Sequence, residues 1–163
     1  AGDIIRQVST PVSRTETAQE LYDRLAQLGG ELLVETVTAI ADGTAQRTPQ
    51  DPAGVTLAPM LSRELSPIDW TRTAAQIHDQ VRGLLPWPVA STDLFGGDKV
   101  KIFTTIETED KTGKEPGTIL RADKAGIDVA CGGGTVLRIT ELQAPGSRRM
   151  AAADYLRGHP ITV

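Results

Sequence analysis

The chain has 163 residues, of which 39% are hydrophobic, 23% charged and only 4% aromatic, and its formal net charge is −4. No apolar run approaches the ~20 residues that a membrane span needs, so these residues do not predict a membrane protein. A net negative chain is a poor non-specific partner for nucleic acid, so only local basic clusters could hold phosphate groups.

The charge is unevenly distributed along the chain. Residues 1–66 contain nine acidic and five basic side chains, whereas residues 67–163 contain twelve of each. Basic clusters able to bind phosphate are therefore expected mainly in the second part. The single cysteine, Cys131, cannot form an internal disulfide, which favours a reducing, cytoplasmic setting. Because the chain does not start with Met, we expect it to be a piece of a longer protein.

Residues 1–43 are expected to form a strand and two helices. A short apolar run at 4–8 favours a strand, and Thr17-Ala-Gln-Glu20 has the spacing of a capping box at a helix start. Leucines then recur at helical spacing, Gly29-Gly30 predicts an interruption, and Gly43 predicts the end of the second helix. One strand and two amphipathic helices cannot close a core, so their apolar faces need a partner, such as a sheet outside these residues.

A linker and a second unit are predicted next. Residues 44–67 contain four prolines and no clear period, which indicates an extended linker. In the unit over 68–163, Thr73-Ala-Ala-Gln76 is another capping box, and Pro86 closes the helix because it lacks a backbone N–H. Short β-like runs separated by glycine turns then predict about five strands in a small barrel, and 150–157 predicts a closing helix.

The stretch RGLLPWPVAS places one of the two tryptophans, Trp87, between two prolines. It follows the predicted helix and precedes the first predicted strand of the barrel, so it redirects the chain between them. We expect Trp87 to contribute buried area and rigidity to this corner. Stacking on RNA is the alternative interpretation of the same residue.

Three features that could indicate a catalytic or metal site have simpler interpretations. CGGGT, beginning at Cys131, lacks the Gly-Lys-Ser/Thr ending of a phosphate loop and is interpreted as a tight hairpin turn. Cys131 has no basic neighbour in the sequence and is expected to be a small buried residue. His78 and His159 are isolated, and with no pair of cysteines they do not predict a metal site.

Basic residues in the second unit are the candidates for phosphate binding. The stretch GSRRM places Arg148 and Arg149 on an exposed loop, where guanidinium groups could pair with phosphate or simply be solvated. Lys99 and Lys101 alternate on a predicted strand, so both heads point to one face; protection of a sheet edge is the alternative. Arg82 precedes the Trp-Pro corner and could instead interact with a helix C-terminus.

Three longer stretches together resemble the C-terminal part of the methionyl-tRNA formyltransferase family. They are IDWTRTAAQIHDQVRGLLPWPVAS, PGTILRADKAGIDVACGGG and LRITELQAPGSRRMAAADYLRGHPI. The resemblance covers essentially the whole chain, in order. It implies an α+β protein in which residues 1–43 end a Rossmann-like catalytic domain, 44–67 form a linker, and 68–163 form an OB-like barrel that binds tRNA.

The resemblance also implies an activity for the longer protein. The family transfers a formyl group from 10-formyltetrahydrofolate to the amino group of methionine on initiator tRNA, which needs a base and donors for an oxyanion. The family's catalytic Asn, His and Asp match no residue of this chain; the Asp would immediately precede Ala1. We therefore expect the fragment alone to be inactive, with no metal, in a monomeric parent enzyme.

In this family the barrel and the linker contact tRNA, mostly without reading bases. By position, Arg148 and Arg149 occupy the family's basic loop and Arg63 a basic position in the linker, while Lys99, Lys101 and Arg82 are further candidates. The barrel is charge-balanced where family members are often basic, and Ala151 and Ala152 replace a frequent helix-capping serine. Two alternatives remain: another folate-dependent formyltransferase, acting for example on a nucleotide sugar, or a non-enzymatic interaction module.

Overall fold

The structure, a computed structural model, describes residues 2–163 and divides into two compact units, one ending at Met60 and the other spanning Leu61–Val163. The first unit contains one long helix in place of a strand and two helices, and the second contains the helices and strands expected of it with some differences in extent. No helix among the described residues combines the length and the apolar character that crossing a membrane would require.

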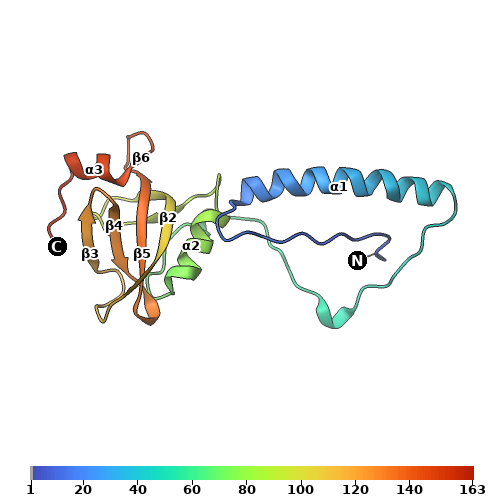
Figure 1. The fold of residues 1–163 in the computed structure, drawn as a ribbon, viewed down its shortest axis with the longest axis horizontal. Coiled ribbons are helices and arrows are strands. Elements are labelled where there is room, and N and C mark those ends of the chain that lie inside the picture. Colours follow the sequence, from blue (N-terminus) through green and yellow to red (C-terminus); the bar gives the residue numbers. More distant parts are fainter. Residues whose placement is uncertain (1) are drawn as a thin grey trace. The chain divides into compact units, whose positions relative to one another are not determined.

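The first unit is built around one long helix, α1 (Ala18–Ala41) (Figure 1). Its start is the predicted capping box: the Thr17 hydroxyl accepts from the Glu20 backbone N–H, and the Glu20 carboxylate accepts from the Thr17 N–H at 2.8 Å. The prediction of two helices is wrong, because α1 continues through Gly29 and Gly30. Glycine in a helix costs only about 1 kcal/mol relative to alanine, and the turns on either side are long enough to offset it.

The strand predicted at 4–8 is also wrong in its extent. Only Ile4 pairs, in a single antiparallel bridge with Thr48 whose two N–H···O bonds are both 2.8 Å long. A strand is stable only when a neighbour completes its hydrogen bonds, and this unit offers a neighbour at one position. The apolar face of α1 is likewise exposed within its unit: Ala39 is the one buried residue of the helix.

The second unit begins with the short helices η2 (Arg63–Leu65) and α2 (Ala74–Gly83). The predicted capping box of α2 is present, since the Thr73 hydroxyl accepts from the Gln76 N–H and the Gln76 side chain accepts from the Thr73 N–H. The helix ends at Gly83, shortly before Pro86, as its missing backbone donor predicts.

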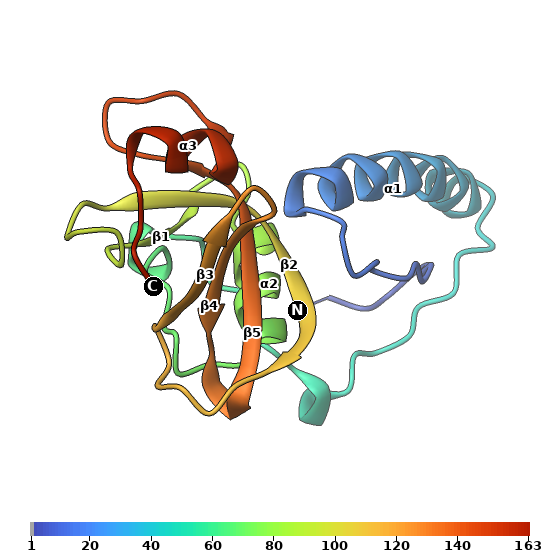
Figure 2. The ribbon, with the colours of Figure 1, turned by 60° about the vertical axis from the view of Figure 1, so that its left-hand side comes forward.

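Six antiparallel strands form one sheet in this unit (Figures 1 and 2). They are β1 (Ala90–Thr92), β2 (Val100–Lys111), β3 (Ile119–Asp123), β4 (Gly126–Ala130), β5 (Thr135–Gln143) and β6 (Met150–Ala151). The order is β1-β2-β5-β4-β3, with β6 on β5. The sheet is not closed, so the OB-like barrel is not confirmed: β1 and β3 are its two edges, and no pairing joins them among the described residues.

The core lies between this sheet and its helices. Helix α2 packs against β2 and β5, and α3 (Ala152–Gly158) packs against β5 and β6. Every residue of β4 is buried. One of these is charged: Asp128, only 2% exposed, accepts hydrogen bonds from the Arg138 side chain at 2.6 Å and from Arg121 at 2.8 Å. The closing helix, predicted over 150–157, begins two residues later because β6 precedes it.

The glycine run after β4 connects it tightly to β5, in agreement with the interpretation as a hairpin turn. Its residues form the short helix η3 (Gly132–Gly134), and Cys131 before it is buried. The Gly132 N–H donates to the carbonyls of Trp70 and Arg72 at 3.0 and 2.8 Å. A Cβ atom at Gly132 would lie 1.7 Å from the carbonyl oxygen of Thr71, so only glycine permits this approach.

Candidate functional site

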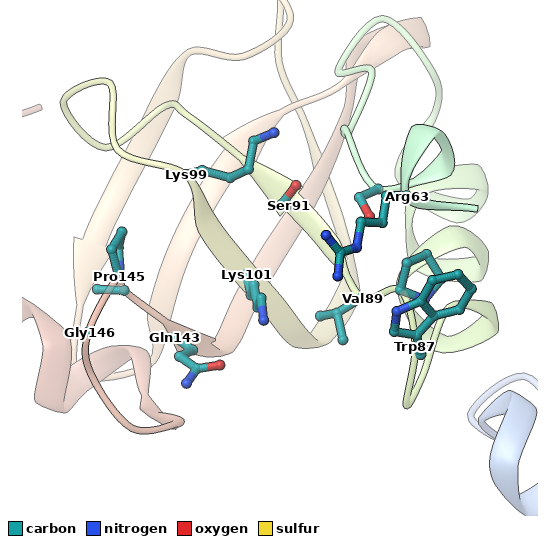
Figure 3. Close-up of a pocket in the computed structure, with 12 residues that line it drawn as sticks. Arg63, Trp87, Val89, Ser91, Lys99, Lys101, Gln143, Pro145 and Gly146 are labelled. Carbon is teal, nitrogen blue, oxygen red and sulfur yellow. The ribbon is translucent and has the colours of Figure 1, made fainter. Parts of the chain in front are cut away.

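A cleft of about 620 Å³ opens on the second unit. Segments far apart in the sequence meet there: η2, the Trp-Pro corner, β1, the start of β2, and the end of β5 with the loop after it (Figure 3). Its lining residues are Arg63, Ser66, Trp87, Pro88, Val89, Ser91, Lys99, Lys101, Gln143, Ala144, Pro145 and Gly146.

Three cations line this cleft, and no acidic residue does. They are Arg63, Lys99 and Lys101, all exposed, and none forms an ion pair with any of residues 2–163. Such an arrangement concentrates positive potential at one place on a chain whose net charge is −4. The three side chains were each candidates from the sequence, but the sequence did not indicate that they share one cleft.

Strand register brings the polar residues of the cleft together. Lys101 on β2 is the Cα partner of Ser91 on β1 and of Gln143 on β5, so the three residues lie side by side across the sheet. Lys99 lies just before β2 and, two residues from Lys101, lines the same cleft while Val100 between them is buried. This agrees with the prediction that both lysine heads point to one face.

Arg63 is held at the cleft by its neighbours in η2. The Gln80 side-chain amide donates to the backbone carbonyls of Leu65 and Pro67 at 2.9 and 3.0 Å. The Ser91 N–H donates to the Ser66 carbonyl at 2.7 Å, which joins the same segment to β1. The guanidinium of Arg63 points into the cleft, toward Val89 and Lys101 (Figure 3).

The Trp-Pro corner forms one side of the cleft. Trp87 was expected to contribute buried area there, and it does so only in part, since the residue is 49% exposed. The corner closes through its backbone instead: the Val89 N–H donates to the Leu84 carbonyl at 3.0 Å, and Val89 has a φ of 69°, which is rare for a β-branched residue. The buried tryptophan is Trp70, whose Nε1 donates to the Thr92 hydroxyl at 3.1 Å.

Two polar residues of the cleft were not predicted from the sequence. Ser91 is 3% exposed, and its hydroxyl oxygen has no hydrogen-bond partner among the described residues. The Gln143 side-chain amide donates to the Ser147 carbonyl at 2.7 Å and so holds the loop between β5 and β6 against the cleft. Neither belongs to a recognisable motif, since their positions follow from the pairing of β1, β2 and β5.

The basic loop carries Arg148 and Arg149, which are both exposed, as predicted. Neither lines the cleft, although Pro145 and Gly146 of the same loop do. Arg149 forms an ion pair with Glu141, and its guanidinium lies 4.7 Å from the centre of the Phe103 ring. The hydrogen bond from Arg149, together with one from the Thr104 hydroxyl at 2.6 Å, lowers the pKa of the Glu141 carboxyl.

Arg82 does not join the other candidates. Its Nη2 atom lies 2.7 Å from Asp79 Oδ1, one turn earlier on α2, and it does not line the cleft. The structure therefore groups Arg63, Lys99 and Lys101, places Arg148 and Arg149 on the adjoining loop, and leaves Arg82 apart. No cluster of three or more metal-ligating side chains occurs within the part of the chain that the structure describes.

Cys131 is not part of the cleft. Burial raises the pKa of its thiol to about 11, so the group is a neutral thiol at physiological pH. Both histidines contact neighbouring side chains. His78 Nδ1 lies 2.9 Å from the Thr105 hydroxyl oxygen, and the His159 ring stacks on the Tyr155 ring with 4.3 Å between the ring centres. The burial of Cys131 agrees with its interpretation from the sequence.

Comparison with known proteins identifies relatives for nearly the whole chain. The family described as formyl transferase, C-terminal domain, matches residues 60–160. Methionyl-tRNA formyltransferase of Acetivibrio thermocellus is 43% identical over 161 residues, covering 98% of this chain and 51% of the relative. The enzyme of the same name from Bacillus subtilis is 40% identical over 158 residues, covering 97% and 50%. The chain thus spans about half the length of these relatives.

Two solved structures show the same fold. HypX from Aquifex aeolicus in complex with tetrahydrofolic acid has a TM-score of 0.66 at 21% identity, over 96% of this chain and 27% of that one. The N-formyltransferase from Helicobacter canadensis, in complex with folinic acid and dTDP-3-aminofucose, has a TM-score of 0.62 at 20% identity, over 85% and 49%. At these identities the likeness concerns the fold alone.

Proposed function

Because the chain belongs to the formyltransferase family and corresponds to the C-terminal portion of methionyl-tRNA formyltransferases, we propose that it binds and orients the tRNA substrate. The parent enzyme would transfer a formyl group from 10-formyltetrahydrofolate to methionyl-initiator-tRNA in the cytoplasm. In this proposal residues 1–43 end the catalytic domain, 44–67 are a linker that contributes Arg63 to RNA binding, and 68–163 supply the other RNA contacts. The catalytic Asn, His and Asp lie on polypeptide outside residues 1–163, so this chain alone does not transfer the group.

The single observation that carries the proposal is a cleft lined by three cations and by no acidic residue, where the cations form no ion pair with any of residues 2–163. Phosphate contacts supply most of the sequence-independent affinity of a protein for RNA, and ammonium and guanidinium groups supply those contacts. A surface that bound a neutral ligand would not need Arg63, Lys99 and Lys101 gathered on an acidic chain. The loop with Arg148 and Arg149 adjoins the cleft and extends the cationic surface.

The described residues give no evidence of a site for the folate. A second cavity, of about 210 Å³, is lined by Ile5, Arg6, Ala39, Thr44, Ala45 and Gln46. Sites for molecules of drug size usually span about 300–1,000 Å³, so this cavity is too small for a folate. In the proposed parent enzyme the formyl donor binds outside residues 1–163, and no catalytic step is assigned to residues of this chain.

The proposal is tested by the salt dependence of tRNA binding to the full chain. Affinity for labelled initiator tRNA should fall with rising salt, with a log–log slope of roughly −3 to −5 if Arg63, Lys99, Lys101, Arg148 and Arg149 contact phosphates. Replacing Arg63 by Ala should make the slope shallower by about one. Lys124→Ala, in the exposed turn between β3 and β4, is the matched control and should change nothing. Salt-independent binding, or none at low salt, would contradict the proposal.

A further inference from the structure

We propose that the cleft holds one unpaired nucleotide of the bound RNA, with its base stacked on the Trp87 ring and its flanking phosphates on Arg63, Lys99 and Lys101. This inference rests on the proposed function and adds to it a ligand class, single-stranded RNA, and a site for it. It concerns stacking and phosphate contacts, which any of the four bases could make.

The exposure of Trp87 supports a stacked base at the cleft. Only two tryptophans occur in the chain, and they have opposite surroundings: Trp70 is buried and hydrogen-bonded, whereas Trp87 is 49% exposed at the edge of the cleft. Leaving a large aromatic ring in water is unfavourable, because its apolar area is not removed from solvent. A base that covers the ring would remove that area from water.

The backbone conformation of Val89 also supports a ligand at the cleft. Its φ of 69° lies in the left-handed region, which a β-branched residue rarely adopts, and the hydrogen bond to the Leu84 carbonyl holds it there. Strained residues of this kind cluster at functional sites, where the surrounding structure maintains them. Here the strained residue follows the Trp-Pro corner directly and itself lines the cleft, so it sets the position of Trp87 relative to the cations.

The cleft combines an aromatic ring with cations, which favours single-stranded RNA as its ligand. Proteins that bind single-stranded nucleic acid pair a positive groove for the backbone with aromatic side chains for the bases. A base within a duplex is stacked on its neighbours and has no free face for Trp87. The cleft volume of about 620 Å³ lies within the range of about 300–1,000 Å³ that is usual for sites holding a small molecule. A flat cationic surface would be enough for a duplex.

The Ser91 hydroxyl lacks a hydrogen-bond partner, which also supports a polar ligand at the cleft. It is buried in the wall of the cleft that Arg63 and Lys99 also line, and it has no hydrogen-bond partner among the residues described (Figure 3). Buried hydroxyls are nearly always hydrogen-bonded, so an orphan of this kind indicates a missing partner. A phosphate or ribose oxygen could be that partner once a neighbouring side chain moves aside.

The test uses the full chain and two RNA tetranucleotides that differ only in one abasic position. Stacking quenches indole fluorescence, so the intact tetranucleotide should quench the wild-type emission, and the abasic one should bind roughly tenfold more weakly. Trp87→Leu should remove the quenching and lower the affinity by a similar factor. The remaining Trp70 reports on folding, because its emission stays blue-shifted while it is buried.

The matched control is Ile106→Ala. Ile106 is an apolar residue of the same unit with the same exposed fraction, 49%, and it does not line the cleft. This variant should keep both the quenching and the affinity. Equal affinity for the intact and abasic tetranucleotides, or unchanged binding by folded Trp87→Leu, would overturn the inference. So would an acidic peptide of the same charge that binds more tightly than RNA and quenches Trp87 equally.

The same measurements distinguish a wrong nucleotide site from a wrong proposal of tRNA binding. If initiator tRNA binds with a steep salt dependence and Arg63→Ala weakens it, while Trp87→Leu has no effect, the cleft contacts only phosphates and the nucleotide site is wrong. If neither tRNA nor the tetranucleotides bind at low salt, the proposed function fails and the inference fails with it.

Discussion

The side-chain amide of Gln80 donates a 2.9 Å hydrogen bond to the backbone carbonyl of Leu65, and through it helix α2 positions the segment that carries Arg63. The two residues are separated by 15 positions in the chain. A second bond from the same amide nitrogen to the Pro67 carbonyl measures 3.0 Å. The cation at the cleft therefore depends on a polar side chain that does not itself line the cleft.

Replacing Gln80 by Ala should lower both stability and RNA affinity. Two hydrogen bonds to backbone carbonyls are lost, which should reduce the free energy of unfolding by about 1–2 kcal/mol. Arg63 is then less well held, and tRNA affinity should fall by a factor close to that of Arg63→Ala. Urea denaturation and anisotropy titration measure the two effects. Gln27→Ala on the exposed face of α1 is the control, and unchanged tRNA affinity of Gln80→Ala would contradict this role for Gln80.

Glu141 should limit the strength of RNA binding by its ion pair with Arg149. Glu141→Gln removes the negative charge and leaves the Arg149 guanidinium more available to phosphate, so tRNA affinity should rise about three- to tenfold at low salt. Glu115→Gln, an exposed acid in the loop between β2 and β3, should have a smaller effect. A decrease in affinity for Glu141→Gln would show that Glu141 positions Arg149 instead of competing with phosphate.

The same pair predicts a pH dependence. Hydrogen bonds from Arg149 and Thr104 lower the pKa of Glu141, so its contribution to stability is present above the unfolded-state pKa and is lost as pH falls through the folded one. In Arg149→Met the pKa of Glu141 should rise toward its ordinary value of about 4.3. NMR titration of the Glu141 side-chain carboxyl carbon follows this change directly. An unaltered pKa would mean that Arg149 does not stabilise the carboxylate.

Cys131 should not react with thiol reagents in the folded chain. Burial raises the pKa of the thiol to about 11, so the nucleophilic thiolate is scarce at about pH 8. Labelling with an aromatic disulfide reagent should be slow in buffer and complete within minutes in denaturant. Rapid labelling of the native chain would show that β4 opens readily at its C-terminal end.

Gly132 is the glycine at which substitution should be most damaging. A Cβ atom there would lie 1.7 Å from the Thr71 carbonyl oxygen, and the backbone at 70–72 that accepts from the Gly132 N–H would have to move. We expect Gly132→Ala to lower the free energy of unfolding by roughly 3 kcal/mol or more. Gly113→Ala, which has nothing within 4 Å of the added carbon, should be nearly neutral. Thermal denaturation of the two variants distinguishes these outcomes.

The sequence by itself was sufficient for the features that depend on residues a few positions apart. The two capping boxes, at Thr17 and Thr73, form as their spacing predicts, because each needs only a hydroxyl and an acceptor three residues later. The turn at 131–135 is local in the same sense. The three stretches that resemble the methionyl-tRNA formyltransferase family could also be recognised from the sequence alone.

Only the tertiary structure decided which distant residues meet and how far the sheet closes. Nothing in the spacing of Arg63 and Lys101 brings them to one cleft; the hydrogen bonds of Gln80 and Ser91 and the register of β1, β2 and β5 do. Composition could not tell the buried Trp70 from the exposed Trp87, because burial depends on what packs against a side chain. The physical reason is the same throughout: capping and turns are short-range, while register and burial are set by contacts between segments that the order of residues does not specify.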